Sequence, residues 1–174
     1  MVQIITPRLR LIALDLRHLR LLRQDRTCLL QALQLVNEDL ILGQEMAEEM
    51  EKSLDFWLLN VESHPKTYAW YTRWEIILTA ENRNIGSIGF NGFPDKQGDI
   101  MVGYAIDERY QNRGFATESL KALIDWASTE ETLKTISAET YMDNHASNRV
   151  LKKNQFTVSL ENDQTILWVK SISA

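Results

Sequence analysis

Residues 99–126 read DIMVGYAIDERYQNRGFATESLKALIDW, and this stretch decides the fold. Its first eight residues, 99–106, are mostly apolar and predict a β-strand. A polar turn follows at 107–114, and residues 115–126 repeat small and apolar side chains at spacings of three and four, which predicts an amphipathic helix. The first amides of a helix have no intrahelical partner, so a strand, a basic turn and a helix in this order predict a phosphate-binding turn.

The turn carries the residues that such a site needs. Gly114 has no Cβ and lets the backbone approach a ligand closely. Ala116, in the first turn of the helix, has a small side chain that leaves the same surface open. Arg109 and Arg113 add positive charge. A glycine alone would also fit an ordinary strand-to-helix connection, so the interpretation depends on the joint pattern Gln111-x-x-Gly114-x-Ala116. Neither the G-x-x-x-x-G-K-[ST] motif nor G-x-G-x-x-G after a strand occurs in the chain, which disfavours the common nucleotide-binding classes.

In this setting the pattern resembles the pyrophosphate loop of the GNAT superfamily of acyl-CoA-dependent N-acyltransferases, which reads Gln/Arg-x-x-Gly-x-Gly/Ala. Residues 144–156 are similar to the family segment Asn-x-x-Ser-x-x-Val-Leu-x-Lys-x-Gly-Phe, and residues 85–89 to its Ile-Gly-x-Ile-Gly strand. Residues 6–11 resemble the opening of the ribosomal-protein N-acetyltransferase-like branch. One position departs: Gln155 stands where glycine is usual, and a left-handed turn there would cost about 1 kcal/mol. We therefore expect a differently shaped helix end.

Composition bounds the class of protein. The chain has 174 residues, of which 44% are hydrophobic and 25% charged, as expected of one soluble globular domain over 1–174. A net charge of -5 disfavours a general nucleic-acid surface. Cys28 is the single cysteine and the three histidines show no ligand spacing, so we expect neither disulfides nor a metal site. No signal peptide and no apolar run of membrane-spanning length is evident, which predicts a cytoplasmic protein without membrane contact.

The rest of the chain reads as alternating strands and helices. We expect one strand over 2–13 with an irregularity or an edge at Pro7, and a short helix capped by Asp15. Further helices are expected over 27–43, ended by Gly43, and over 45–61. Residues 68–79, 85–90 and 99–106 predict an antiparallel meander, 134–141 a further strand, 145–153 a helix, and 156–160 with 165–171 a terminal hairpin. Gly86 and Gly89 inside their strand indicate a bulge or the close approach of a ligand.

The resemblance implies the fold class: an α/β (α+β mixed) GNAT fold, with a mixed, mostly antiparallel, twisted sheet of about seven strands flanked by helices. It also implies that the fourth and fifth strands, 99–106 and 134–141, splay apart to admit pantetheine. The amide of Tyr104 would polarise the thioester carbonyl, the backbone of Ile106 would pair with pantetheine, and Gly103 would lie at a β-bulge. The residues that the resemblance assigns to acetyl-CoA binding are Tyr104, Ile106, Gln111, Asn112, Arg113, Gly114, Phe115, Ala116 and Asn144.

For proton transfer, the resemblance points to Ser147 as the acid beside the leaving thiolate. Asn144 and Ser147 are equally suited to the N-cap and first turn of a helix, so both interpretations stay open. Tyr141, at the end of its strand, is an alternative donor. For the base the sequence leaves Asp99, Glu75 and a water-mediated route open.

The first hypothesis is therefore an acetyl-CoA-dependent N-acetyltransferase with no metal. Its acceptor would be a primary amine, either a protein or peptide N-terminus or a small molecule, attacking the thioester directly. The alternative is a catalytically inactive acyl-CoA-binding sensor or interaction module, which thioester cleavage would distinguish. A purely structural domain ranks last, and a homodimer is compatible with the family.

Overall fold

The computed structural model describes residues 1–172, apart from the side chain of Glu45. Eight strands form one sheet in the order β1-β2-β3-β4-β5-β6-β8-β7. The strands are β1 Gln3–Ile5, β2 Leu9–Ala13, β3 Arg73–Leu78, β4 Arg83–Phe90, β5 Asp99–Ile106, β6 Thr135–Tyr141, β7 Thr157–Glu161 and β8 Thr165–Ser171. The helices are α1 Leu16–Gln24, α2 Arg26–Ala32, α3 Gln44–Ser63, α4 Phe115–Ala127 and α5 His145–Lys153. The mixed, mostly antiparallel sheet flanked by helices is the predicted fold class.

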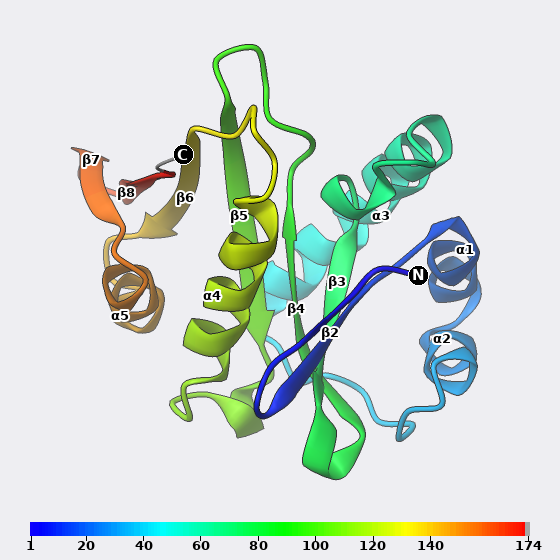
Figure 1. Cartoon of the computed structure of the whole chain (residues 1–174). Helices are drawn as coiled ribbons and strands as arrows, with labels where there is room; N and C mark the ends of the chain where they lie inside the picture. The colour runs from blue at the N-terminus through cyan, green and yellow to red at the C-terminus, as the bar shows by residue number, and fades with distance from the viewer. Residues whose placement is uncertain (173–174) are drawn as a thin grey trace.

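The sheet opens between β5 and β6 (Figure 1). These two strands are its parallel pair, and they pair only from Asp99↔Thr135 to Met101↔Ser137. The other neighbours are antiparallel, including the predicted meander of β3, β4 and β5. Beyond Met101 the two strands diverge, which confirms the expected splay.

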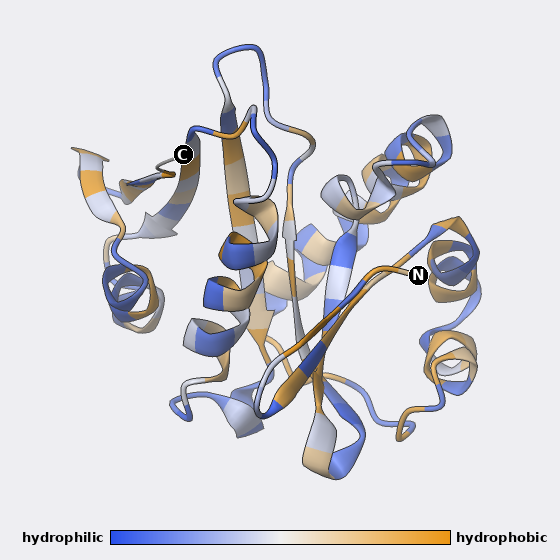
Figure 2. Cartoon of the chain, in the orientation of Figure 1, coloured by the Kyte–Doolittle hydropathy of each residue, from blue (hydrophilic) through white to orange (hydrophobic). Residues whose placement is uncertain are grey.

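A separate hydrophobic core lies on each face of the sheet. In β2, Leu9 and Leu11 face the core that contains the inward side of α4, whereas Ile12 faces the core under α1, α2 and α3. This alternation follows from the two-residue period of a strand. Figure 1 places α4 and α3 on opposite sides of the central strands, and Figure 2 shows apolar residues along β5 and polar ones on the outer sides of the helices. Within residues 1–172, no helix has both the length and the apolar character needed to cross a membrane.

The single strand predicted over 2–13 was wrong. Pro7 lies in a turn between β1 and β2, which pair with each other in antiparallel register. Thr6 closes this turn: its backbone N–H donates to Leu9 O (2.9 Å), and Leu9 N donates back to its hydroxyl (2.9 Å). Proline cannot donate to a ladder, so the chain reverses here instead of continuing. The sheet therefore has eight strands rather than about seven.

Two other predicted elements were too long. The helix predicted over 27–43 ends at Ala32, and Gly43 instead caps the start of α3. Residues 33–43 form no helix because their backbone bonds go elsewhere, as when Val36 N donates to Asn82 O (3.1 Å). The strand predicted over 68–79 begins only at Arg73, after a short 3₁₀ turn over Tyr68–Trp70.

Glycines in β4 mark close backbone approach rather than a ligand. A Cβ at Gly86 would lie 2.2 Å from Ala105 O, and one at Gly89 would lie 2.7 Å from Thr72 O. The pairing of β3 with β4 shifts register beside Gly86, as the glycines of this strand predict. The register of β4 with β5, in contrast, runs without a shift through Gly103, so the bulge expected there is absent from this ladder.

The C-terminal end of α5 has the usual glycine-type shape despite its sequence. Gln155 adopts φ 66°, in the left-handed region. Phe156 N donates to Leu151 O and Gln155 N to Lys152 O, both at 3.0 Å, which is the Schellman pattern. The expectation of a differently shaped end was wrong, because the two cap bonds hold the glutamine in the conformation that glycine would take.

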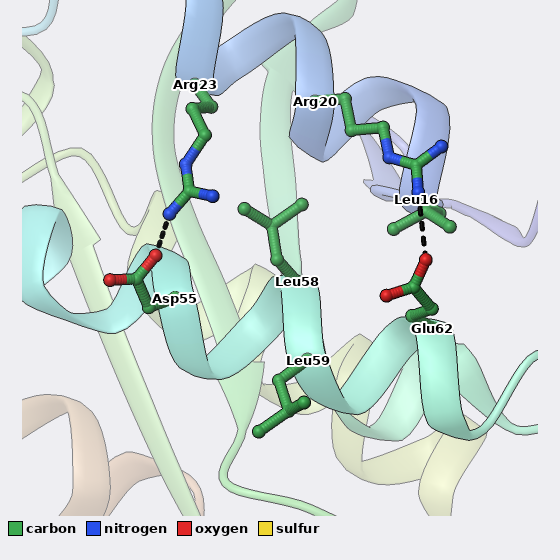
Figure 3. Close-up of a pocket in the computed structure, with 7 residues that line it drawn as sticks. All are labelled: Leu16, Arg20, Arg23, Asp55, Leu58, Leu59 and Glu62. Atoms are coloured by element: carbon green, nitrogen blue, oxygen red, sulfur yellow. Dashed lines mark hydrogen bonds and ion pairs between the residues drawn. The ribbon is translucent and has the colours of Figure 1, made fainter.

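Helices α1 and α3 are joined by two ion pairs (Figure 3). Arg20 Nη2 lies 2.9 Å from Glu62 Oε1, and Arg23 pairs with Asp55. A hollow of about 310 Å³ between these pairs has leucine side chains on its wall. The pairs link α1 to the middle and the C-terminal half of α3, away from Met46 at the start of that helix.

Candidate acyl-CoA site

A cavity of about 380 Å³ lies where β5 and β6 separate. Its walls come from the end of β5, the turn into α4, the first half of α5 and the start of α3. The residues that line it are Leu42, Gly43, Met46, Tyr104, Ala105, Ile106, Tyr110, Gln111, Asn112, Gly114, Phe115, Ala116, Thr117, Asn144, Ala146, Ser147, Arg149, Val150 and Lys153. The sheet splay thus produces an opening at the turn that the sequence singled out.

The free edge of β5 directs backbone groups into this opening. Residues of an antiparallel ladder alternate between those that exchange backbone hydrogen bonds and those that do not. Asp107 N donates to Ile85 O (2.9 Å) in line with the unbroken register, so odd-numbered residues of β5 bond to β4. Tyr104 and Ile106 therefore direct their N–H and C=O groups toward the β6 side, where pairing has ended. The side chain of Gln111 donates to Ile106 O (3.0 Å), which leaves the Ile106 N–H for a ligand.

The turn into α4 presents uncapped amides. Gly114 is the N-cap at φ 82°, and no side chain caps the helix. A Cβ at this position would meet only Arg8 Nη2, at 3.5 Å, so the glycine is needed for its left-handed backbone. The amides of Phe115, Ala116 and the residue after them open the helix beside the cavity, where an anion is favoured by the helix dipole.

The N-terminal hairpin holds this turn in place. Arg8 Nη1 donates to Arg113 O (3.0 Å), and its Nε donates to Glu118 in the first turn of α4 (2.6 Å). The hydroxyl of Thr6 donates to the same carboxylate (2.6 Å). Burial by itself raises the pKa of Glu118, but the bonds from Thr6 and Arg8 outweigh it and lower that pKa below its usual value. The motif at residues 6–11 is thus explained by its contact with the turn.

A second anchor ties residues 38–42 to the other side of the turn. Arg109 hydrogen-bonds the buried Asp107 and lowers its pKa to about 2. Asp107 in turn accepts from Ile41 N (2.9 Å), and Glu108 N donates to Ile41 O (2.9 Å). Arg109 is therefore used in holding the loop, and Leu42 is brought to the cavity wall as a consequence.

On the opposite wall, α5 begins with a side-chain cap. Asn144 Oδ1 accepts from Ser147 N (3.0 Å), so the capping interpretation of Asn144 is correct, and the residue also lines the cavity. The phenol of Tyr104 reaches across from β5 and lies 2.7 Å from Ser147 Oγ. Burial raises the pKa of Tyr104 to about 12, although its bond with Ser147 opposes the shift. A protonated phenol and a serine hydroxyl therefore meet on the wall of the cavity.

Most of the residues singled out from the sequence are brought together. Nine of the eleven line the cavity; the two that do not are Arg113 and Tyr141. The Arg113 guanidinium lies 5.3 Å over the Tyr110 ring, and Tyr141 is 60% exposed at the end of β6. Among the carboxylates considered as bases, Glu75 is fully buried between Arg73 and Asn84 and lines no part of the cavity.

Sequence reasoning missed two parts of the wall. On α5, Ala146, Arg149, Val150 and Lys153 recur at helical spacing, and this face could have been found from the periodicity beside Ser147. Leu42 and Gly43 directly precede α3 and Met46 lies in its first turn, so no local pattern at the turn over 107–114 marks them. Among residues 1–172 no group of three or more metal-binding side chains comes together.

Comparison with known proteins agrees with this geometry. The family model "Acetyltransferase (GNAT) domain" matches residues 8–157, and the chain belongs to this family. It is 29% identical over 99 residues to the uncharacterized N-acetyltransferase YjdG of Bacillus subtilis, covering 57% of this chain and 59% of that one. It is 30% identical over 97 residues to the ribosomal-protein-serine acetyltransferase of Escherichia coli, covering 56% and 52%. The matched regions thus span about half of these relatives.

Among solved structures, the chain superposes on RimL, described as a ribosomal L7/L12 alpha-N-protein acetyltransferase in complex with coenzyme A. The TM-score is 0.67 at 23% identity, with 98% of both chains covered. At this identity the likeness establishes the fold. The splayed sheet, with its slot at the Gln111–Ala116 turn, is therefore the GNAT fold.

Proposed function

We propose that the protein is an acetyl-CoA-dependent N-acetyltransferase. The observation that carries the proposal is the cavity in which the uncapped amides of α4 and the unused N–H groups of Tyr104 and Ile106 meet. The pyrophosphate of acetyl-CoA would bind at the helix terminus, because an anion there is stabilised by free N–H groups and by the helix dipole. The pantetheine arm would follow the free edge of β5.

The residues of the cavity wall support binding of the pyrophosphate and of the thioester end. Arg149 and Lys153 lie one helical turn apart on α5 and add positive charge to the wall that faces the turn. The N–H of Tyr104 is suited to donate to the thioester carbonyl, where negative charge develops when an amine attacks. Ser147 is placed to meet the sulfur that leaves. Two reactants held in one slot react with a smaller entropic barrier, so no covalent enzyme intermediate is needed.

We further propose that the acceptor is a primary amine at the N-terminus of a protein or peptide. The E. coli relative is named a ribosomal-protein-serine acetyltransferase, and the RimL structure is described as an alpha-N-protein acetyltransferase. A small-molecule amine is the other acceptor class to test.

The test is titration of the purified protein with acetyl-CoA, followed by thiol release against N-terminal peptides and small amines. We expect saturable binding and amine-dependent thiol release. Ala116→Glu places a carboxylate on the cavity wall beside the helix terminus, whereas Ala116→Gln adds the same bulk without charge. The Glu variant should bind acetyl-CoA roughly five- to thirtyfold more weakly than the Gln variant, since charge repulsion in a partly buried site costs about 1–2 kcal/mol. Equal binding by the two variants would refute the pyrophosphate assignment, and binding without thiol release would favour the sensor.

A further inference from the structure

The phenol of Tyr104 bridges the two sides of the slot. Tyr104 stands on β5, and Ser147 stands in the first turn of α5, after the strand that diverges from β5. The Tyr104 oxygen lies 2.7 Å from Ser147 Oγ and 3.3 Å from Ser147 O. Both side chains line the cavity, so this contact belongs to the wall of the proposed acyl-CoA site.

Either oxygen could donate in the 2.7 Å contact, and we assign the phenol as the donor from the lengths of the two contacts. The contact of 2.7 Å has the length of a good O–H···O hydrogen bond, whereas 3.3 Å lies outside the usual range. The phenol has one proton, and it makes its better bond by donating it to Ser147 Oγ. If Ser147 donated to the phenol instead, the phenol proton would have only the distant carbonyl as acceptor. With the phenol assigned as the donor, the Ser147 proton is directed away from Tyr104.

We propose that Tyr104 is a positioning residue that turns the Ser147 hydroxyl toward the sulfur of the thioester. The inference rests on the proposed N-acetyltransferase function and deepens it. Ser147 N is already fixed by the Asn144 cap (3.0 Å), so the serine has its backbone held by α5 and its proton direction held by β5. A single serine in the first turn of an exposed helix would have no such preference.

This pair would assist the attack of the acceptor amine on the thioester. The lone pair of the amine nitrogen forms the new C–N bond, the C–S bond breaks, and its electron pair goes to sulfur. Ser147 donates a hydrogen bond to the developing thiolate and keeps its proton. The surplus proton on nitrogen goes to water, and the released thiolate takes a proton from water.

The pKa of Tyr104 agrees with a phenol that donates a hydrogen bond to Ser147 and does not give up its proton. Burial raises the pKa of Tyr104 to about 12, whereas an ordinary thiol has a pKa of about 8.5. The phenol therefore stays protonated while the thiolate leaves, and it remains a donor to Ser147 throughout the neutral pH range.

The experiment is a double-mutant cycle with Tyr104→Phe, Ser147→Ala and the double variant, measured as kcat and as KM for acetyl-CoA. We expect Ser147→Ala to lower kcat roughly tenfold or more, as loss of a hydrogen bond to a charged group does. Tyr104→Phe should lower kcat roughly three- to tenfold with KM changed less than about twofold. In the Ser147→Ala background the tyrosine change should have almost no further effect, because no hydroxyl remains to be oriented.

Tyr68→Phe is the matched control, since it removes a phenol hydroxyl that bonds Val2 N, outside the cavity. It should leave kcat unchanged. If Tyr104→Phe has wild-type kcat, or if its effect is undiminished without the serine hydroxyl, the inference is overturned while the transferase stands. A wild-type protein that binds acetyl-CoA but releases no thiol with any amine overturns the proposed function and this inference together.

Discussion

At the scale of single residues, Gln155 carries strain that the fold imposes. It holds a left-handed conformation at φ 66° in which a residue with a Cβ is disfavoured by about 1 kcal/mol. We predict that Gln155→Gly raises the free energy of unfolding by about 1 kcal/mol and the Tm by about 2–4 °C. Gln155→Ala removes the contact with Lys170 (3.2 Å) but keeps the strain, so it should give no gain. Urea unfolding that finds the two variants equally stable would contradict this account.

A buried ion pair gives the second prediction at this scale. Arg73 Nε lies 2.9 Å from Glu75 Oε1, both residues are buried, and Asn84 donates to the other carboxylate oxygen. Burial lowers the pKa of Arg73, and the charge of Glu75 opposes that shift. We predict that Glu75→Ala costs about 3–5 kcal/mol of folding free energy, because it leaves a buried charge without its partner.

The control for this pair removes both charges. Arg73→Met with Glu75→Leu should recover most of the loss, since a buried ion pair replaced by apolar groups of similar size is often nearly neutral. Chemical denaturation of the single and double variants measures both values. A double variant that is less stable than Glu75→Ala would show that the pair itself stabilises the sheet.

At the scale of elements, the loop before α3 depends on one carboxylate. The buried Asp107 has a pKa of about 2, held there mainly by Arg109, with the Ile41 amide contributing. Its pKa is lower in the folded than in the unfolded protein, so its contribution to stability is complete above about pH 4 and is lost as the pH falls toward 2. We predict that the stability of the wild type declines over this window more steeply than that of Asp107→Asn.

The same variant tests the anchor at neutral pH. Asp107→Asn should cost about 2 kcal/mol, because hydrogen bonds to a charged group contribute about 1.5–3 kcal/mol. Thermal unfolding of both proteins at a series of pH values gives the comparison. Parallel pH profiles would show that Asp107 does not anchor residues 38–42 to the turn.

The elements also show what the sequence can and cannot predict. The strand, turn and helix over 99–126 were predicted almost to the residue, because apolar periodicity and Gly114 act locally. The hairpin at Pro7 was missed, since a proline in a strand indicates either an edge or a turn and only the pairing of β1 with β2 decides. The prediction of a helix through residues 33–43 was wrong for a different reason. The backbone partners of these residues, such as Asn82, lie far along the chain.

The candidate site has the same limit: the sequence predicts local conformation but not contacts between residues far apart in the chain. The strand-turn-helix pattern predicted the conformation around Gly114, whereas the backbone roles of Tyr104 and Ile106 came from the family resemblance and stay predictions. The contact of the Tyr104 phenol with Ser147 joins residues 43 positions apart and follows only from the splay of the sheet. Tyr141, the alternative donor, is 60% exposed at the end of β6 and lies outside the cavity wall, and its role stays a prediction.

At the scale of the whole molecule, the splay leaves the two parts of the sheet joined by only three residue pairs, from Asp99↔Thr135 to Met101↔Ser137. A ligand in the slot would contact α4 and β5 on one side and α5 on the other. We therefore predict that coenzyme A at 100 times its Kd stabilises the protein by about 2.7 kcal/mol, which corresponds to a rise in Tm of about 5–10 °C for a chain of this size.

The positions at which bound coenzyme A slows hydrogen exchange show whether it contacts both walls of the slot or only one. Hydrogen exchange should slow both in the first turn of α4 and in the first turn of α5, because a ligand that spans the slot orders both walls. Ala116→Glu should reduce the rise in Tm, whereas Ala116→Gln should reduce it much less. Protection confined to α4 would mean that the ligand holds only the pyrophosphate turn. The pantetheine arm would then not bind in the slot between β5 and β6.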